Sequence, residues 1–273
     1  MTINCNGILV DLSTPKVMGI LNCTPDSFYD GGKYKSEQII LQQVEKMLIE
    51  GAAFIDVGAY SSKPGAEFVS ENEELSRLLP VIDIILKHFS NTILSIDTFR
   101  SSVAQKAVAS GAAIINDISA GAFDRNMMQM VGELKVPYIM MHIKGTPQTM
   151  QSLANYENIM KELLLYFSEK IALAKKFKIN DIIIDPGFGF AKTLEQNYEV
   201  LQHLELLKIV ELPLLAGLSR KSMIYKLLET TAQNSLNGTS VLNTIALQKG
   251  ASILRVHDVK EAAECIMLQS KFR

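Results

Sequence analysis

Eight short apolar runs in this sequence each carry a polar or charged side chain at or just beyond their end. The runs are Val17–Leu21, Phe54–Val57, Ile93–Ile96, Ala113–Ile115, Tyr138–Met141, Ile182–Ile184, Leu214–Leu218 and Ile253–Val256. The polar residues are Asn22, Asp56, Asp97, Asn116, His142, Asp185, Ser219 with Lys221, and Arg255 with His257. Helix caps are mostly Ser, Thr, Asp and Asn, so capping does not explain the histidines, the lysine and the arginine. A set of acids, amides and cations suits a ligand that combines a hydrogen-bonding ring with a negatively charged group.

Asp185 stands out because it directly follows three β-branched apolar residues in the stretch IIIDPGFGF. A carboxylate at the end of a buried strand costs free energy unless something pairs with it. The partner must come either from the fold or from a ligand, and the stretch itself leaves both sources open.

Several common catalytic motifs are absent from the sequence. GFGFAK begins like a dinucleotide-binding fingerprint, but Lys192 occupies the position that requires glycine, and there is no P-loop. The four histidines lack the H-x-x-x-H spacing of a zinc site. Cys5, Cys23 and Cys265 are odd in number and far apart, which argues against a disulfide framework. Cys23 has no histidine near it in sequence, so we interpret it as a small apolar core residue and not as a nucleophile.

The runs alternate with segments of helical periodicity, which indicates the fold that positions the polar residues. Residues 36–51, 72–89 and 156–177 repeat apolar side chains every three or four positions. Strands that are apolar on both faces are typical of a parallel sheet covered by helices. Eight such units predict an α/β protein with a single (β/α)8 TIM barrel, in which all strand ends open onto the active-site face. We expect one domain over residues 1–273, with a short N-terminal β-hairpin around CNGILVDLS closing the bottom of the barrel.

Composition excludes several classes of function. The net charge is −2, the isoelectric point is near 6.1, and no basic tract indicates binding to nucleic acid or to a membrane surface. The N-terminus lacks a secretory signal pattern, and no window resembles a membrane span. We therefore expect a cytoplasmic protein. The long glycine-containing loops 22–32 and 58–67 are candidate lids over a substrate.

Six motifs occur in a fixed order between about residue 16 and residue 260. They are MGILNCTPDSFYDGG, SIDTFR, INDIS, IIIDPGFGFAKT, GLSRKSM and ILRVHDV. Together they resemble the dihydropteroate synthase family of folate biosynthesis. The resemblance implies a transferase that joins 6-hydroxymethyl-7,8-dihydropterin pyrophosphate to p-aminobenzoate, releases pyrophosphate, and is a sulfonamide target.

The resemblance also implies a role for individual residues at the pterin and pyrophosphate ends of the site. The expected pterin-binding residues are Asp97, Asn116, Asp185, Lys221, Met140 and Gly217. The expected pyrophosphate-binding residues are Asn22, Ser62, Arg255 and His257, with Asn22 also holding Mg²⁺. A carboxylate such as Asp185 can accept two adjacent N–H donors from the pterin edge. Magnesium prefers oxygen ligands and substrate phosphates, which suits an asparagine amide.

The remaining roles concern the second substrate and the chemistry. The expected p-aminobenzoate pocket consists of Phe28, Ser62, Pro64, Phe190, Lys221 and Ser222, and the expected catalytic residues are Asp97, Lys221, Arg255 and His257. The resemblance also implies that displacement at the exocyclic CH₂ of the pterin follows an SN1-like route, which is chemically reasonable because the electron-rich ring delocalises the cation. No protein nucleophile is then required.

One loop departs from the family pattern, and two alternative functions stay open. The family commonly has ESTRPG where this chain has YSSKPG, so Ser62 replaces threonine and Lys63 replaces arginine. Lysine cannot form a bidentate fork on phosphate, so the role of Lys63 is open. A methyltetrahydrofolate-dependent methyltransferase or a non-catalytic pterin-binding protein would share the pterin-reading residues, but SRKS and RVHD favour the synthase. The family also implies a homodimer.

Overall fold

Eight parallel strands form a barrel in the computed structural model, which describes residues 1–23, 33–60 and 68–272. They are β3 (Lys16–Asn22), β4 (Ala52–Gly58), β5 (Leu94–Asp97), β6 (Ile114–Asp117), β7 (Tyr138–Met141), β8 (Ile182–Asp185), β9 (Leu215–Ala216) and β10 (Ile253–Val256). Their order is β8-β7-β6-β5-β4-β3-β10-β9, and a bridge between Ile184 and Leu214 joins the two ends. The predicted (β/α)8 TIM barrel is confirmed.

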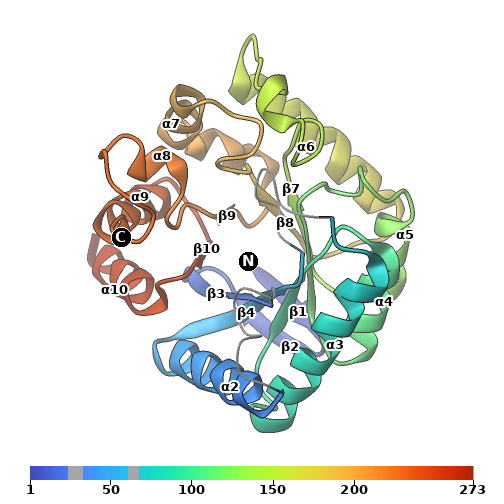
Figure 1. Cartoon of the computed structure of the whole chain (residues 1–273). Coiled ribbons are helices and arrows are strands. Elements are labelled where there is room, and N and C mark those ends of the chain that lie inside the picture. Colours follow the sequence, from blue (N-terminus) through green and yellow to red (C-terminus); the bar gives the residue numbers. More distant parts are fainter. Residues whose placement is uncertain (24–32, 61–67, 273) are drawn as a thin grey trace.

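Helices follow the strands and form an outer ring around them (Figure 1). They are α2 (Lys33–Ile49), α3 (Glu71–His88), α4 (Ser101–Ala109), α5 (Met127–Leu134), α6 (Ile159–Lys176), α7 (Leu194–Gln202), α8 (Ser222–Tyr225), α9 (Leu236–Gln248) and α10 (Val259–Gln269), with 3₁₀ turns at Met150–Leu153, Leu204–Val210 and Ser270–Phe272. Local signals set several starts. The hydroxyl of Ser70 caps α3, and Thr193 with Gln196 forms a capping box on α7.

Strand alternation divides the apolar side chains into two layers. Successive residues of a strand point to opposite faces. On one face, residues such as Ile55, Ile96 and Ile184 pack against the surrounding helices. The other face fills the barrel interior with Met18, Phe54, Ile114, Ile139, Ile183, Leu215 and Ile253. Because the interior is already filled at this level, a ligand can enter only beyond it, toward the C-terminal ends of the strands.

An N-terminal hairpin covers the opposite end of the barrel, as predicted. Strands β1 (Thr2–Cys5) and β2 (Ile8–Asp11) pair antiparallel around Asn6 and Gly7, whose φ angles of 51° and 88° suit a tight hairpin turn. Ile3, Cys5 and Leu12 join the interior apolar layer. The amide of Asn4 donates to Asp181, just before β8, at 3.0 Å. The hairpin therefore seals the N-terminal end and leaves the C-terminal end for function.

Within the described ranges, none of the helices combines the length and apolar character needed to cross a bilayer.

The interior layer predicts a large difference between two isoleucines. Ile183 is fully buried inside the barrel, whereas Ile49 at the end of α2 is 80% exposed. We expect Ile183→Ala to lower the free energy of unfolding by about 2–5 kcal/mol, because it leaves a cavity. We expect Ile49→Ala to change it by no more than about 0.5 kcal/mol. Urea denaturation followed by circular dichroism measures both, and equal losses would contradict the layer assignment.

Candidate active site

Arg255 lies at the centre of an ion network at the C-terminal end of the barrel. Its Nε donates to Asp56 Oδ2 at 2.6 Å and its Nη2 donates to Asp97 Oδ2 at 2.8 Å. The amide of Asn116 donates to the same Asp56 oxygen at 3.1 Å. These four residues come from β10, β4, β5 and β6, so the network joins four strands at one level of the barrel.

Burial shapes the electrostatics of this network. Burial raises the pKa of Asp97, and Asp56 beside it acts in the same direction, while Arg255 opposes both. Burial alone would lower the pKa of Arg255, but Asp56 and Asp97 together raise it above its ordinary value. Asp56 is fully buried, and its Oδ1 finds no hydrogen-bond partner among the described residues. The network therefore holds a surplus of acceptor capacity that a donor-rich ligand can satisfy.

Asp56 has a larger part in this arrangement than the sequence indicated. It was noted as a polar residue in the second apolar run but was given no role. An aspartate inside an apolar strand run, with apolar neighbours on both sides, was the available signal. Its partner Arg255 is 199 positions away, so the pairing itself was not visible.

Asp185 and Lys221 are two further charged residues at the same end of the barrel, and both lie next to Gly217. Asp185 Oδ1 accepts the backbone N–H of Gly187 at 2.7 Å. A Cβ atom at Gly217 would lie 3.8 Å from Lys221 Nζ and 4.0 Å from Asp185 Oδ2, so both charged groups border this glycine. Burial raises the pKa of Asp185, and Lys221 opposes that shift. Burial lowers the pKa of Lys221 to about 8, with Asp185 opposing.

The loop after β8 supplies the surroundings of Lys221. Lys221 Nζ donates a short hydrogen bond to the carbonyl of Phe188. The same nitrogen lies 5.0 Å from the centre of the Phe190 ring, which is cation–π range. Ser222 follows as the first residue of α8. Phe190, Lys221 and Ser222, predicted to share one subsite, thus lie on two loops that contact each other.

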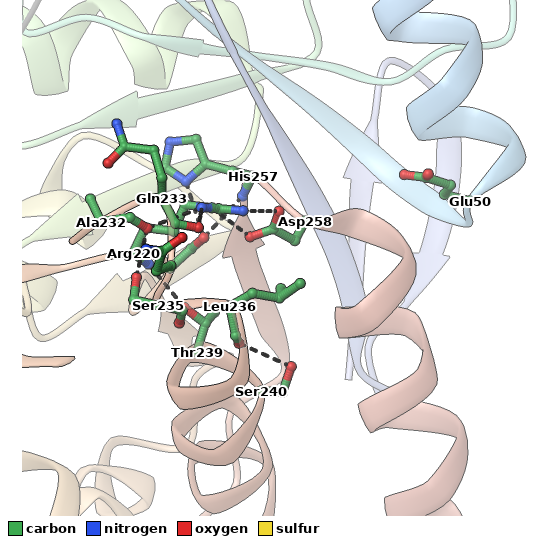
Figure 2. A network of polar contacts seen from close by, with 12 residues as sticks. Glu50, Arg220, Ala232, Gln233, Ser235, Leu236, Thr239, Ser240, His257 and Asp258 are labelled. Atoms are coloured by element: carbon green, nitrogen blue, oxygen red, sulfur yellow. Dashed lines mark hydrogen bonds and ion pairs between the residues drawn. The ribbon is translucent and has the colours of Figure 1, made fainter. Parts of the chain in front are cut away.

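A third network lies beside His257 (Figure 2). Arg220 donates to both Asp258 oxygens, from Nε at 2.9 Å and from Nη2 at 2.8 Å, and its Nη1 donates to the carbonyls of Ala232 and Gln233 at 3.0 and 2.6 Å. His257 Nδ1 lies 3.0 Å from the hydroxyl of Ser219. The geometry joins the loop before α8 to the turn before α10.

Arg220 itself has an unusual backbone conformation. Its φ is 55°, in the left-handed region that non-glycine residues rarely occupy. The hydrogen bond to Asp258 also raises the pKa of Arg220. The bidentate ion pair holds the residue in this conformation, between Ser219 and Lys221, and so fixes where both neighbours point. No individual role for Arg220 or Asp258 was predicted from the sequence.

Two predictions are changed by the register of β7. Met140 was expected to line the pterin pocket, but it belongs to the outer layer that packs on the helices. Its neighbour Met141 instead packs with Ile118 and Ile143 in a cluster that also contacts Phe190. By the same alternation His142 points outward, where it is buried beside Lys192. The strand-end pattern correctly predicted the height of these residues along the barrel axis, but it could not predict whether their side chains point into or out of the barrel.

Asn22 ends β3 and is exposed there, with its Cα paired to Gly58 of β4. Alternation from the interior residue Met18 places Asn22 on the inner face. Across the parts of the chain that the structure covers, no group of three or more His, Cys, Asp or Glu residues is arranged to hold a metal ion. One exposed amide oxygen still fits Mg²⁺, which commonly binds one or two protein oxygens and completes its shell with substrate phosphates and water.

Three residues of the second-substrate and pyrophosphate predictions lie outside the described residues, namely Phe28, Ser62 and Pro64. Lys63, whose role is open, and most of loops 22–32 and 58–67 lie outside as well.

Known proteins resemble this chain over nearly its whole length. The family described as pterin binding enzyme matches residues 18–257. Dihydropteroate synthase from Synechocystis is 44% identical over 251 residues, covering 91% of this chain and 86% of that protein. The Haemophilus influenzae dihydropteroate synthase is 41% identical over 268 residues, covering 97% of each.

Solved structures show the same likeness. The Yersinia pestis dihydropteroate synthase in a sulfonamide drug complex superposes with a TM-score of 0.93 at 40% identity, covering 100% of this chain and 99% of that one. The Xanthomonas albilineans dihydropteroate synthase with 4-aminobenzoic acid gives a TM-score of 0.92 at 35% identity, covering 99% and 97%.

The Arg220–Asp258 pair predicts a measurable coupling. A double-mutant cycle of Arg220→Ala and Asp258→Ala should give a coupling free energy of about 0.5–3 kcal/mol in unfolding, because the contact is bidentate and partly buried. The control cycle on Lys46 and Glu50, which are 3.8 Å apart on the surface of α2, should give no more than about 0.5 kcal/mol. Equal coupling in the two pairs would show that Arg220 acts as an ordinary surface charge.

Proposed function

The chain belongs to the dihydropteroate synthase family of pterin-binding enzymes, transferases of folate biosynthesis, and from this membership we propose how its own residues carry the reaction. The reaction joins 6-hydroxymethyl-7,8-dihydropterin pyrophosphate to p-aminobenzoate and releases pyrophosphate. The relatives favour neither the methyltransferase nor the non-catalytic alternative. The observation that carries the assignment of residues is that the buried Asp185 and the partly buried Lys221 both border Gly217, at the same end of the barrel as the Arg255 network.

We assign the pterin to the space that Asp185, Asp97 and Asn116 border. A pterin edge presents adjacent N–H donors. Burial raises the pKa of Asp185, and a buried carboxylate that lacks water is stabilised strongly by hydrogen bonds from such donors. Asp185 keeps one oxygen occupied by the Gly187 amide. Lys221 approaches the acceptor side of the ring. A ligand without the donor edge would leave these acids unpaired, and this gives the site its selectivity.

Arg255 and His257 are assigned to the pyrophosphate end. The structure gives Arg255 a second task that the sequence did not indicate, because two of its nitrogens are already bonded to Asp56 and Asp97. Arg255 thus neutralises the acids and presents its remaining N–H groups to the leaving group. His257 is exposed at the end of β10. Asn22 would hold Mg²⁺, which supplies positive charge to the departing pyrophosphate. Ser62 was assigned to the same end and lies outside the described residues.

Charge separation during displacement explains the mixture of signs in the site. Breaking the bond between the exocyclic CH₂ and oxygen leaves positive charge on the pterin and negative charge on pyrophosphate. We assign Asp97 and Asp56 to the side of the developing cation, and Arg255, which donates to both acids, to the side of the leaving group. Preorganised charges of this kind act strongly in a site shielded from water. The amine of p-aminobenzoate then attacks the CH₂ group and loses a proton.

The p-aminobenzoate subsite is assigned to Phe190, Lys221 and Ser222. The ring of Phe190 and the ammonium of Lys221 are within 5.0 Å of each other and offer one apolar wall and one positive charge. These features match a flat aromatic acid. Phe28, Ser62 and Pro64, which the family resemblance assigns to the same pocket, lie outside the described residues.

We also propose a cytoplasmic homodimer. The proposal is supported by the family resemblance and by exposed apolar residues on the last helices, namely Val241 on α9 and Met267 and Leu268 on α10.

An assay of pyrophosphate release tests the assignment of Asp185. Purified protein with Mg²⁺ and the pterin substrate should release pyrophosphate only when p-aminobenzoate is added. Asp185→Asn should weaken pterin binding about 10- to 100-fold, because it replaces a charged acceptor of hydrogen bonds that are worth about 1.5–3 kcal/mol each. Isothermal titration calorimetry with the pterin substrate measures this change.

The matched control is Asp181→Asn, which lies before β8 at the opposite end of the barrel and accepts the Asn4 amide. It should leave pterin affinity unchanged. Normal affinity in Asp185→Asn would overturn the assignment, and failure of the wild-type chain to release pyrophosphate would overturn the function.

The lowered pKa of Lys221 predicts a pH dependence. Because burial lowers this pKa to about 8, the ammonium is present below that pH and is lost as the pH rises through it. We expect kcat/KM for the pterin substrate to fall on the alkaline side with a midpoint near pH 8, reporting the free enzyme. Lys221→Arg keeps its charge throughout and should move that midpoint upward. An unchanged midpoint in this variant would show that another group causes the alkaline fall in kcat/KM.

A further inference from the structure

Lys192 is a buried basic residue that the proposed reaction does not use, and burial lowers the pKa of its side chain to about 7. It occupies the position at which GFGFAK departs from a dinucleotide fingerprint, and it is 3% exposed. Its Nζ lies 3.1 Å from His142 Nδ1, 3.0 Å from the carbonyl of Gly187 and 3.1 Å from the carbonyl of Phe190. An ammonium group has three donors, so these three acceptors use all of them. A lysine satisfied in this way is a tether and has no donor left for a ligand.

One end of the tether is His142, directly after β7. His142 is buried, with its ring edge-on to Tyr166 at 4.8 Å between centres. Burial, together with the charges of Lys192 and Lys144, lowers the pKa of His142 to about 2, so the ring is neutral. Its Nδ1 then accepts from Lys192 and its proton resides on Nε2. The histidine serves as a fixed acceptor on a rigid strand end.

The other end of the tether is the loop 186–191. At Gly187, with φ of 69°, an added Cβ would meet the carbonyl oxygen of His142 at 2.2 Å, so the loop lies directly on the end of β7. Asn197 of α7 holds it from the other side, because its Oδ1 accepts the Gly189 amide at 2.7 Å. Buried side chains from two neighbouring elements therefore clamp this short loop.

The clamped loop carries the groups that contact Lys221. The Phe188 carbonyl accepts from Lys221 Nζ, and the Phe190 ring lies 5.0 Å from that nitrogen. Lys192 bonds to the carbonyls of Gly187 and Phe190, on either side of Phe188. Any shift of the loop would move the acceptor of Lys221 and the aromatic wall together.

We propose that Lys192 is a positioning residue, which fixes loop 186–191 so that Phe188 and Phe190 hold Lys221 in place for p-aminobenzoate. The inference rests on the proposed function for its substrate and on the hydrogen bonds of Lys192 for its mechanism. A lysine that merely stabilised the fold would change the amount of folded enzyme. A positioning lysine changes the affinity for p-aminobenzoate, which depends on both Phe190 and Lys221, more than the affinity for the pterin, which Asp185, Asp97 and Asn116 also hold.

Steady-state kinetics of Lys192→Met tests the proposal, because methionine keeps the length of the side chain and removes the three donors. We expect the KM for p-aminobenzoate to rise about tenfold, equivalent to about 1.4 kcal/mol, and the KM for the pterin substrate to rise no more than about threefold. Lys192→Arg, which keeps charged donors, should recover part of the loss.

The matched control is Lys170→Met. Lys170 on α6 also donates to a backbone carbonyl, that of Ala120 at 2.8 Å, but it does not contact loop 186–191. This variant should leave both KM values unchanged. Unchanged KM values in Lys192→Met, or an equal rise in both, would overturn the proposal.

Two further measurements keep the test decisive. If Lys192→Met does not fold, the variant Asn197→Leu tests the proposal instead, because it frees the Gly189 amide and loosens the same loop. We expect the same preferential rise in KM for p-aminobenzoate in this variant, and the absence of that rise overturns the proposal. If the wild-type chain shows no synthase activity, the proposed function fails separately. Hydrogen exchange at the Gly189 and Phe190 amides then tests the tether alone. Faster exchange in Lys192→Met than in Lys170→Met supports the tether, and equal exchange refutes it.

Discussion

The ion network of Arg255 with Asp56 and Asp97 is the interaction on which the rest of the site depends. Two carboxylates brought together in a buried place repel each other and lose their hydration, so they require a cation between them. Arg255 meets this requirement from a strand that is far from both in sequence but close to both in the barrel. Removing any one of Arg255, Asp56 and Asp97 would leave uncompensated charge on the others, so the three residues form one unit. Within that unit Arg255 has a structural task as well as its assigned contact with pyrophosphate.

The barrel brings such a unit together because parallel strands place equivalent residues at equivalent heights. Below the network the inner face is packed with apolar side chains, and the hairpin closes that end. At the level of the network the inner residues become Asp56, Asp97, Asn116, Asp185 and Arg255, as each strand reaches its C-terminal end. On β4, β6, β8 and β10 the switch from the apolar to the polar layer takes two residues, from Phe54 to Asp56, Ile114 to Asn116, Ile183 to Asp185 and Ile253 to Arg255. The packed apolar layer makes the barrel rigid, and the polar layer above it carries the residues assigned to the substrates.

The sequence was sufficient to predict the barrel, the hairpin and the height at which polar residues gather. It did not give the direction in which residues at that height point. Strands that are apolar on both faces carry no alternation that shows which way a side chain points. Met140 was therefore assigned to the pterin pocket, and the outward direction of His142 was not predicted. Pairs of residues far apart in the sequence could not be predicted for a different reason. Arg220 with Asp258, and Arg255 with Asp56, are brought together only by closure of the barrel.

Asp117 shows why neither residue type nor burial identifies a ligand-binding acid. It is fully buried at the end of β6, beside the inward-facing Asn116. Its oxygens accept from the hydroxyl of Tyr138, the amide and hydroxyl of Ser119 and the amide of Gly121, at 2.6–2.7 Å. The fold supplies every donor that this carboxylate needs, so it fixes a loop. Asp56 is equally buried, but its Oδ1 has no hydrogen-bond partner within the described ranges of the chain. Because an unpaired buried acceptor destabilises the free protein, its persistence at the open end of the barrel is physically consistent with a ligand that completes it.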